Sequence, residues 1–588
     1  MGSGESTHDI SPQTRSEETP DENAADIDFR IADNPAMNEP GAPPQYLLSD
    51  TNSNQELNDF PEMNFRQLAD TISWSDTAPL THGIHKHPAI FIPHIPRYLI
   101  NTFSTEQNED GNRPVVLDPF SGSGTTGVEA KIAGRDYLGV EINPVSKLVS
   151  DVATTPIPYT VLKNAKRELK RRLDEVETQY YEDYDVEFLD KTKKAHWFED
   201  SAINGLTTVR KVVTEFIEDD VELMAEIESH ESKVVAEIDV DELLDTDVTK
   251  WLILLVANTV FDVSNADPEV SKAHKSKKMR KQIENGEHPP DPVEVYKDHL
   301  DRSVAKLIDL WNEVYRMNVP GGASQTITLN GATQSTLHKF SDNWIPLEEN
   351  QAHQATTNIQ LGDARDFEFP DHLEGVDMAI TSPPYINAIN YYRGTKLRLF
   401  WIQDLLEGNT DVDAETLRRS FIGTNSATIK GIEDELPFMM NDQWGGTWEE
   451  YEETCLPELD DHILNIHNGD LVEAKSRAYI TWKFFAEDML QSLTSVYRHL
   501  KPGAYFFFVI GENTISSRRI QSHRFVADIA QNLGKFNNQD DDISKGEGYR
   551  LAGMAWDKIT NRDLFHGRDH GNGVIEREWV VILQKPRQ

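Results

Sequence analysis

The stretch ITSPPYINAINYY, residues 380–392, places several chemically useful groups directly after an apolar run that predicts a buried strand. Ser382 carries a hydroxyl that can donate and accept hydrogen bonds. Pro383 and Pro384 fix the backbone angle φ and donate no N–H, so their carbonyls remain available as acceptors. Tyr385 offers an aromatic face for stacking. Alone, such a segment is typical of a proline-rich turn with a packed tyrosine, so a chemical role depends on its neighbours.

A second stretch, VVLDPFSGSGTT at residues 115–126, predicts a strand, a tight glycine turn and the start of a helix. Such a turn presents free N–H groups and small side chains to a ligand. A phosphate loop is the obvious alternative, but no lysine follows the glycines as GK[ST] requires, and the spacing is not GxGxxG. Asp118 would repel a phosphate and attract an ammonium group. The candidate ligand contacts in this turn are Asp118, Pro119, Phe120, Gly122, Ser123, Gly124, Thr125 and Thr126.

Two further predicted strands also end in acidic residues. DYLGVEIN ends at Glu141, where a carboxylate in this kind of fold can accept both hydroxyls of a ribose. NIQLGDARDF places Asp363 where it can accept from an adenine amino group. Together with Asp118, these acids describe a pocket for a cationic nucleoside without phosphates, a description that fits S-adenosyl-L-methionine (SAM). Solvated acids at the strand ends of an acid-rich chain are the alternative interpretation.

These segments resemble the amino-methyltransferases of DNA. LDPFSGSGTT is similar to the cofactor motif of that family, TSPPY to its catalytic motif, and YRHLKPGAYFFFVIGEN to its fifth strand. HKHPAIFIPHIPRYLI is similar to the helix that covers the methionine end of the cofactor, which adds His87 and Pro88 as candidate contacts. The resemblance covers residues 82–150 and about 355–588. It implies an α/β fold with a Rossmann-like class I methyltransferase sheet of seven strands, the last hairpin antiparallel.

The resemblance also implies a reaction. An exocyclic amine of a base is a poor nucleophile because its lone pair is delocalised into the ring. If the Ser382 hydroxyl and the Pro383 carbonyl accept its two hydrogens, the lone pair can face the methyl donor, and one such interaction contributes about 3 kcal/mol. Tyr385 would stack on a base flipped out of the duplex.

Serine at the first motif position goes mostly with cytosine N4 in the resembling family, whereas Asp or Asn goes mostly with adenine N6. We therefore predict methylation of cytosine N4 in double-stranded DNA, in restriction-modification or host defence, with a restriction or defence component as a possible partner. Adenine N6 methylation, RNA base methylation and a non-catalytic DNA-binding module remain alternatives. Methylation at cytosine C5 is disfavoured because Cys455 lies in an acidic stretch that disfavours a thiolate.

Composition and periodicity divide the chain into four parts. Residues 1–65 predict a disordered acidic tail, and residues 66–150 the cofactor half of the sheet. Long amphipathic helical patterns fill residues 151–324, a helical insertion and candidate DNA-recognition domain. Residues 325–588 then complete the catalytic half of the sheet. In many members of the resembling family that carry serine in the catalytic motif, the catalytic half precedes the cofactor half. Here the cofactor half comes first, so the position of the recognition domain does not follow from the resemblance.

The chain has a net charge of -43, with 100 acidic and 57 basic residues, which suits a halophilic source. Basic clusters therefore stand out. The first occupies SKAHKSKKMRKQ, which we interpret as a loop without acidic neighbours that contacts DNA phosphates through Lys272, Lys275, Lys277, Lys278, Arg280 and Lys281. The second, KNAKRELKRR at residues 163–172, is more typical of a solvated helix face.

Other features limit the cellular setting. No apolar stretch approaches the roughly 20 residues of a membrane span, and the start of the chain has no signal-peptide pattern, so we expect a soluble cytoplasmic protein.

A single cysteine excludes disulfide frameworks and cysteine-based zinc sites. His85, His87 and His94 are expected to have structural and cofactor-covering roles, with no metal site.

Overall fold

The computed structural model describes 18 separate stretches of the chain. They are residues 63–65, 78–86, 91–105, 107–108, 111–189, 191–219, 240–268, 273–315, 352–368, 373–386, 391–406, 414–423, 456–467, 474–515, 518–536, 543, 546–558 and 577–587. His87, Pro88 and Lys272, together with the predicted tail as far as residue 62, lie outside these ranges.

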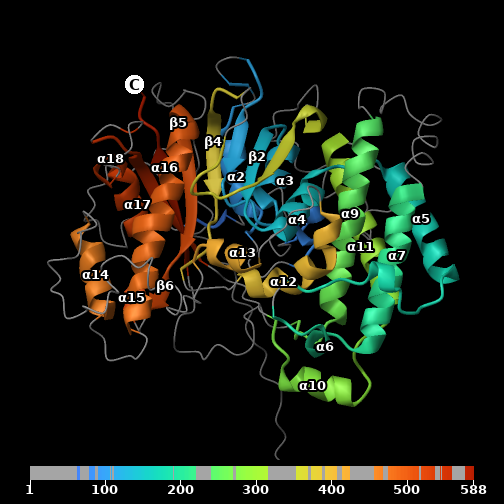
Figure 1. Ribbon diagram of the computed structural model, residues 1–588. Coiled ribbons are helices and arrows are strands. Elements are labelled where there is room, and N and C mark those ends of the chain that lie inside the picture. The colour runs from blue at the N-terminus through green and yellow to red at the C-terminus, as the bar shows by residue number, and fades with distance from the viewer. Residues whose placement is uncertain are drawn as a thin grey trace, which may run out of the picture.

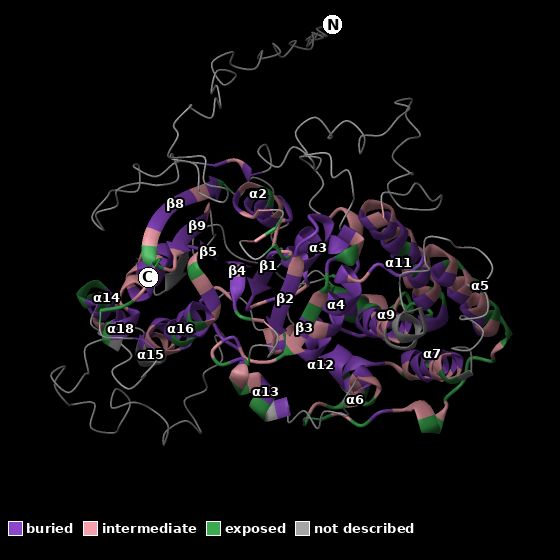
Figure 2. Cartoon of the chain, turned by 90° about the horizontal axis from the view of Figure 1, so that it is seen from above, coloured by how far each residue is buried: buried purple, intermediate pink, exposed green. Residues whose placement is uncertain are grey.

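A seven-stranded sheet forms the centre of the molecule (Figure 1). Its order is β3-β2-β1-β4-β5-β9-β8, and Figure 2 shows the strands following one another from β8 to β3. All neighbouring strands are parallel except β9, which is antiparallel to both β5 and β8. This confirms the predicted Rossmann-like methyltransferase sheet. The strands are β1 (Val115–Asp118), β2 (Asp136–Glu141), β3 (Thr357–Leu361), β4 (Val376–Thr381), β5 (Leu500–Gly511), β8 (Arg550–Lys558) and β9 (Arg577–Gln584).

The strand order reverses between β1 and β4. From β1 the chain builds outward through β2 to β3, and it then returns to place β4 on the other side of β1. In open α/β sheets, ligands bind outside the carboxyl ends of the strands at such a reversal. Both candidate turns therefore follow strands that flank the expected crevice.

The central strands are apolar because both of their faces are covered. Alternate residues such as Val116, Met378 and Phe507 pack in a core with α2 (His94–Phe103) on one face. Their neighbours Leu117 and Phe508 pack on the other face against residues of three helical segments. Those segments are the π-helical turn Lys483–Met489, α16 (Leu490–His499) and α17 (Ser522–Gln531).

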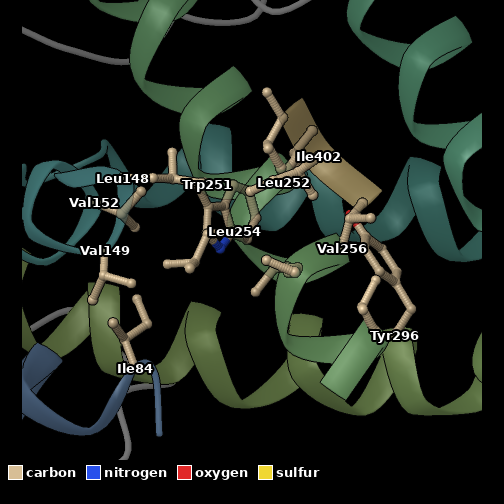
Figure 3. Packing of buried hydrophobic residues seen from close by; sticks show 14 of the residues in the cluster. Ile84, Leu148, Val149, Val152, Trp251, Leu252, Leu254, Val256, Tyr296 and Ile402 are labelled. Atoms are coloured by element: carbon tan, nitrogen blue, oxygen red, sulfur yellow. The ribbon is translucent and has the colours of Figure 1, made fainter. Parts of the chain in front are cut away.

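A group of helices packs over β1 and β2 and beyond the β3 edge of the sheet (Figure 2). We call the following elements the helical layer: α3 (Thr125–Ile132), α4 (Pro144–Thr154), α5 (Tyr159–Glu175), α7 (Asp200–Asp219), α9 (Val240–Val263), α11 (Pro292–Tyr315) and α12 (Tyr391–Ile402). Figure 3 shows its centre, where Trp251 and Leu252 of α9 lie near Leu148 of α4 and Ile402 of α12. The central part of α9 is apolar on every side, as expected of a helix surrounded by protein. The core of the predicted insertion is thus continuous with α3, α4 and α12, which belong to the two halves of the sheet.

The end of the predicted tail lies in the core rather than in solvent. Met63 and Phe65 are both buried, and the Met63 N–H donates to the Trp556 carbonyl at 2.8 Å. The Phe65 ring packs edge-on against Tyr98 of α2. The folded part of the chain therefore begins before the predicted boundary at residue 65.

The remaining elements are shorter. A small antiparallel hairpin, β6 (Asn513–Ile515) with β7 (Arg518–Ile520), follows β5. Figure 1 shows α10 below α6, away from the sheet. Among the described residues, no helix combines the length and apolarity that a bilayer crossing requires. The other helices are α6 (Lys194–Trp197), α10 (Lys277–Glu284), α13 (Ala414–Ser420), α14 (Pro457–His467), α15 (Ala474–Trp482) and α18 (Leu533–Phe536).

Candidate active site

The glycine turn connects β1 to α3, as predicted. Gly122 and Gly124 have φ angles of 56° and 79°, which side-chain-bearing residues rarely adopt. Gly124 also lacks space for a side chain, because an added Cβ would lie 2.9 Å from Cα of Ser150. Within the turn, Phe120 and Ser123 are half-buried, while Pro119, Thr125 and Thr126 are buried. The backbone conformation therefore favours glycine at both positions, and the lack of space requires it at Gly124.

Asp118 is turned inward, away from solvent. It is 2% exposed, and its carboxylate accepts hydrogen bonds from the Thr126 hydroxyl at 2.7 Å, the Thr381 hydroxyl at 2.6 Å and the Phe120 N–H at 3.0 Å. Burial raises the pKa of Asp118 to about 6, although these three hydrogen bonds oppose the rise. Asp118 therefore joins the end of β1 to the end of β4. The contact with a ligand ammonium group stays a prediction: the three donors occupy three of the roughly four acceptor positions of the carboxylate.

Glu141 holds the glycine turn from the end of β2. Its two carboxylate oxygens accept from the N–H groups of Gly122 and Asn143, both at 2.8 Å. Burial raises the pKa of Glu141 to about 7; those two N–H groups oppose the rise, and the nearby charge of Asp118 adds to it. The residue is still partly exposed. Each oxygen therefore keeps capacity to accept a further hydroxyl donor from a ligand.

Asp363 follows β3 and is engaged by a neighbouring arginine. The guanidinium of Arg365 contacts both carboxylate oxygens, with Nε 2.9 Å from Oδ1 and Nη2 2.5 Å from Oδ2. Arg365 also reaches Asp488 at 2.8 Å and the carbonyl of Ser420 at the end of α13. The predicted acceptor for an adenine amine is thus oriented by a bidentate ion pair.

The serine turn, residues 382–385, follows β4 directly. Thr381 is buried at the strand end, and its hydroxyl contacts Asp118, so this turn begins beside the origin of the glycine turn. Pro383 is buried, whereas Ser382 and Pro384 are half-buried. The Ser382 hydroxyl lies 3.5 Å from the hydroxyl of Tyr385.

Tyr385 is tied to a distant part of the chain. Its hydroxyl donates to the carboxylate of Glu578, at the start of β9, at 3.0 Å. Burial, followed by the charge of Glu578, raises the pKa of Tyr385 well above its usual value. The phenol therefore stays protonated and acts as a donor at neutral pH.

The predicted covering segment is anchored on the glycine-turn helix. Glu129 of α3 is fully buried and accepts from Arg97 of α2 at 2.5 Å and from His82 at 2.7 Å. Burial alone would raise the pKa of Glu129, but Arg97 and His82 hold it below its usual value. His85 contacts Asn258 at 2.5 Å, and His94 is buried, which is consistent with structural roles for both histidines.

The first basic cluster is helical, which corrects the prediction of a loop. Ser276 caps α10 by accepting from the Met279 N–H, so the segment has a regular helix start. Lys275 lies 3.8 Å from Glu199, contrary to the expected lack of acidic neighbours. The remaining basic residues of the cluster are exposed on α10: Lys277, Lys278, Arg280 and Lys281.

The approach to α10 contacts the start of α12. The Ala273 N–H donates to the carbonyl of Arg393 in the first turn of α12.

The second basic cluster, on α5, behaves as predicted for a solvated helix face. Lys166 and Lys170 both pair with Asp301, and Arg171 pairs with Glu168 and Glu175.

Sequence reasoning missed several of these positions. Thr381 was detectable, since it directly precedes the serine turn at a strand end. Arg365 was also detectable, because an arginine two residues after an acid can fold back on it. Glu578 had no such signal, since it lies 193 residues from Tyr385 in the chain.

Comparisons with known proteins identify similar DNA methyltransferases. Residues 37–149 match the DNA methylase family of N6 and N4 methyltransferases. The chain is 22% identical over 460 residues to the type II methyltransferase M.MvaI of Kocuria varians, which covers 77% of this chain and 82% of that protein.

Two further relatives are similar over shorter stretches. The type II methyltransferase M.MjaII of Methanocaldococcus jannaschii is 26% identical over 21% of this chain and 22% of its own length. The type II methyltransferase M2.DpnII of Streptococcus pneumoniae is 36% identical over 15% of this chain and 28% of its own length. No solved structure matches the chain significantly.

Proposed function

We propose that the chain is an N4/N6 DNA amino-methyltransferase and that it transfers a methyl group from SAM to the N4 amine of cytosine in double-stranded DNA. One observation carries the proposal. The Thr381 hydroxyl contacts the Asp118 carboxylate at 2.6 Å, so the glycine turn and the serine turn start side by side at the reversal point of the sheet. A methyl donor held by one turn can therefore face a base held by the other.

The residues present fit a cationic nucleoside. Asp118 and Glu141 have pKa values raised to about 6 and about 7, which means that two neighbouring carboxyl groups are difficult to ionise in the free protein. A positively charged ligand beside them would favour their ionised forms. SAM, when bound, supplies a methyl group on a positively charged sulfur. Glu141 would accept its ribose hydroxyls, and Asp363 would accept from its adenine amine.

The serine turn supplies the groups that act on the base. The Ser382 hydroxyl and the Pro383 carbonyl accept hydrogen bonds from the two N–H groups of the target amine, which concentrates its lone pair on nitrogen. As the N–C bond forms and the S–C bond of the donor breaks, one amine proton would leave to water at the half-exposed turn. The Tyr385 ring stacks on the flipped base and limits its tilt. Asp118 also keeps the two turns at a fixed separation through Thr126 and Thr381.

The choice of cytosine over adenine rests on Ser382. A neutral hydroxyl at this position goes mostly with cytosine N4 in this family, while a carboxylate or amide goes mostly with adenine N6. The exposed basic face of α10 supports a phosphate-contacting role for this helix, since Ala273 joins its approach to the start of α12. The type II relatives support a place in restriction-modification, with a nuclease as partner.

Identification of the modified nucleoside tests the proposal. DNA from cells that express the protein would be digested and analysed by mass spectrometry, with cells that express Ser382→Ala as the control. N4-methylcytosine should accumulate only with the unaltered protein. N6-methyladenine would instead establish the alternative base. Modification of RNA alone, or SAM binding without any modified base, would contradict the proposal.

A further inference from the structure

We propose that Glu578 is a positioning residue for Ser382 and acts through the hydroxyl of Tyr385. The inference rests on the proposed function, because it assigns a task within the same site. Two contacts carry it: Tyr385 donates to Glu578 at 3.0 Å, and the hydroxyls of Tyr385 and Ser382 lie 3.5 Å apart. Nothing in the pattern of the serine turn requires either contact, since an aromatic ring alone suffices for stacking.

The sheet brings Glu578 to this position from the far end of the chain. Between β4 and β9 lies β5, whose Phe508 pairs with Thr381 and whose Gly511 pairs with Glu578. Gly511 has no side chain, so the β5 residue opposite Glu578 occupies none of the space beside its carboxylate. Glu578 can therefore reach a side chain that extends from the β4 side of the site.

The chain of hydrogen bonds has one direction. An ionised carboxylate only accepts, so Glu578 orients the Tyr385 proton toward itself. The lone pairs of the Tyr385 oxygen then face the Ser382 hydroxyl and can accept a hydrogen bond from it. With its own proton directed at Tyr385, the Ser382 oxygen presents only lone pairs to the target amine. Without this order, Ser382 could point its proton at the amine and fail to accept from it.

The distances of 3.0 Å between Tyr385 and Glu578 and 3.5 Å between Tyr385 and Ser382 are compatible with a substrate-free site. Hydrogen bonds between catalytic groups are often long in free enzymes and shorten when the substrate binds. All three side chains are partly exposed, so a base can still reach them. The high pKa of Tyr385 keeps its proton available for Glu578 throughout the neutral range.

Three variants test the inference: Tyr385→Phe, Glu578→Ala and the double variant. The assay measures the single-turnover rate of transfer from labelled SAM to genomic DNA of a host that lacks this modification. Each single variant should lower this rate about tenfold, as expected for loss of one hydrogen bond to a charged group. The double variant should be no slower than either single variant, because both changes interrupt the same chain. SAM affinity, measured by calorimetry, should stay within twofold, and Glu578→Gln, which retains an acceptor oxygen, should restore part of the rate.

A matched control removes the hydroxyl of another hydrogen-bonded tyrosine. Tyr549→Phe takes away a hydroxyl that donates to the Leu493 carbonyl at 3.0 Å, remote from both turns. It should lower the melting temperature about as much as Tyr385→Phe while leaving the transfer rate unchanged. If Glu578→Ala and Tyr385→Phe transfer methyl groups at the normal rate while Ser382→Ala is inactive, the inference is wrong and the proposed function stands. If Ser382→Ala is itself active, the proposed function fails.

Discussion

The glycine turn after β1 and the serine turn after β4 lie at neighbouring strand ends but have opposite properties. The first uses Gly122 and Gly124 at positive φ, so it can bend tightly, and the N–H groups of Phe120 and Gly122 donate to Asp118 and Glu141. The second uses Pro383 and Pro384, which present acceptors and restrict φ. Asp118 joins the two through one hydroxyl from each side, Thr126 and Thr381.

This contrast implies a division of labour. A tight turn of small residues lets a cofactor approach the backbone closely, while an acceptor-rich, rigid turn suits polarisation of an amine. Changes in the glycine turn should therefore alter cofactor affinity, and changes in the serine turn should alter the transfer rate. Changes at the connection should alter both.

Loss of the serine hydroxyl should have the largest effect. Ser382→Ala removes an acceptor aimed at the amine, and a group of this kind is worth about 3 kcal/mol, which corresponds to a 100-fold to 1,000-fold lower transfer rate. SAM affinity by calorimetry should be unchanged. A large loss of SAM affinity in this variant would break the proposed division between the turns.

Gly124→Ala should have the next largest effect, on cofactor affinity. The added methyl group would meet Ser150, and the φ of 79° would be strained, so the turn must shift. We expect SAM affinity to fall about 100-fold, as for about 3 kcal/mol of distortion.

Gly286→Ala is the matched control for Gly124→Ala. Gly286 also has a positive φ, of 71°, but an added Cβ would meet nothing within 4 Å. It should show only the cost of backbone conformation, as a small fall in melting temperature with normal SAM affinity. Equal effects of the two substitutions would mean that the contact with Ser150 is unimportant.

Thr381→Val tests the connection between the turns. The substitution keeps the shape of the side chain but removes a hydroxyl that donates to a buried carboxylate, a bond worth about 1.5–3 kcal/mol. We expect about a tenfold loss in both SAM affinity and transfer rate. Thr126→Val, which removes the donor on the cofactor side, should affect mainly SAM affinity, and a purely catalytic loss there would contradict this view of Asp118.

The affinity for SAM should depend on pH through Glu141. Its pKa is raised to about 7, so the carboxyl group takes up a proton as the pH falls through 7 and becomes a poorer acceptor for ribose hydroxyls. Calorimetry should show affinity falling up to tenfold between pH 8 and pH 6. Glu141→Gln should bind more weakly but with a flatter profile; an equally steep profile would assign the titration to another group.

Charge reversal on α10 should have the smallest effect and should spare both turns. Lys277→Glu with Arg280→Glu should weaken DNA binding several-fold at moderate salt and reduce its salt dependence, while SAM affinity stays normal. Lys163→Glu with Arg167→Glu on α5 makes the same change in net charge at exposed positions and serves as the control. Equal weakening by both pairs would indicate a general charge effect rather than a contact through α10.

The sequence predicted the parts of the fold that have strong local patterns. Continuous apolar runs identified β1, β4 and β5, and Gly122 and Gly124 marked the turn. Strand β8 was missed because RLAGMAWDK has no clear alternation, and its pairing with β9 shifts register between Leu551 and Gly553. Helix α10 was taken for a loop because only Met279 of its residues is buried, so it lacks the apolar stripe of a packed helix.

The sequence predicted which residues form the site better than it predicted their hydrogen-bond partners. The sequence identified Asp118 as important, but side-chain direction depends on Thr126 and Thr381, and the latter is 263 residues away. The pairing of Asp363 with Arg365 was within reach of local reasoning, whereas the contact between Tyr385 and Glu578 depends on the strand order of the finished sheet.

The continuous core of the helical layer restricts how this enzyme could be redesigned. Trp251 of α9 and Trp401 of α12 are fully buried in one cluster together with residues of α3 and α4. Grafting residues 151–324 from a homologue would leave these faces without complementary partners, so such chimeras should misfold rather than acquire a new target sequence. The exposed α10 is the segment most readily exchanged.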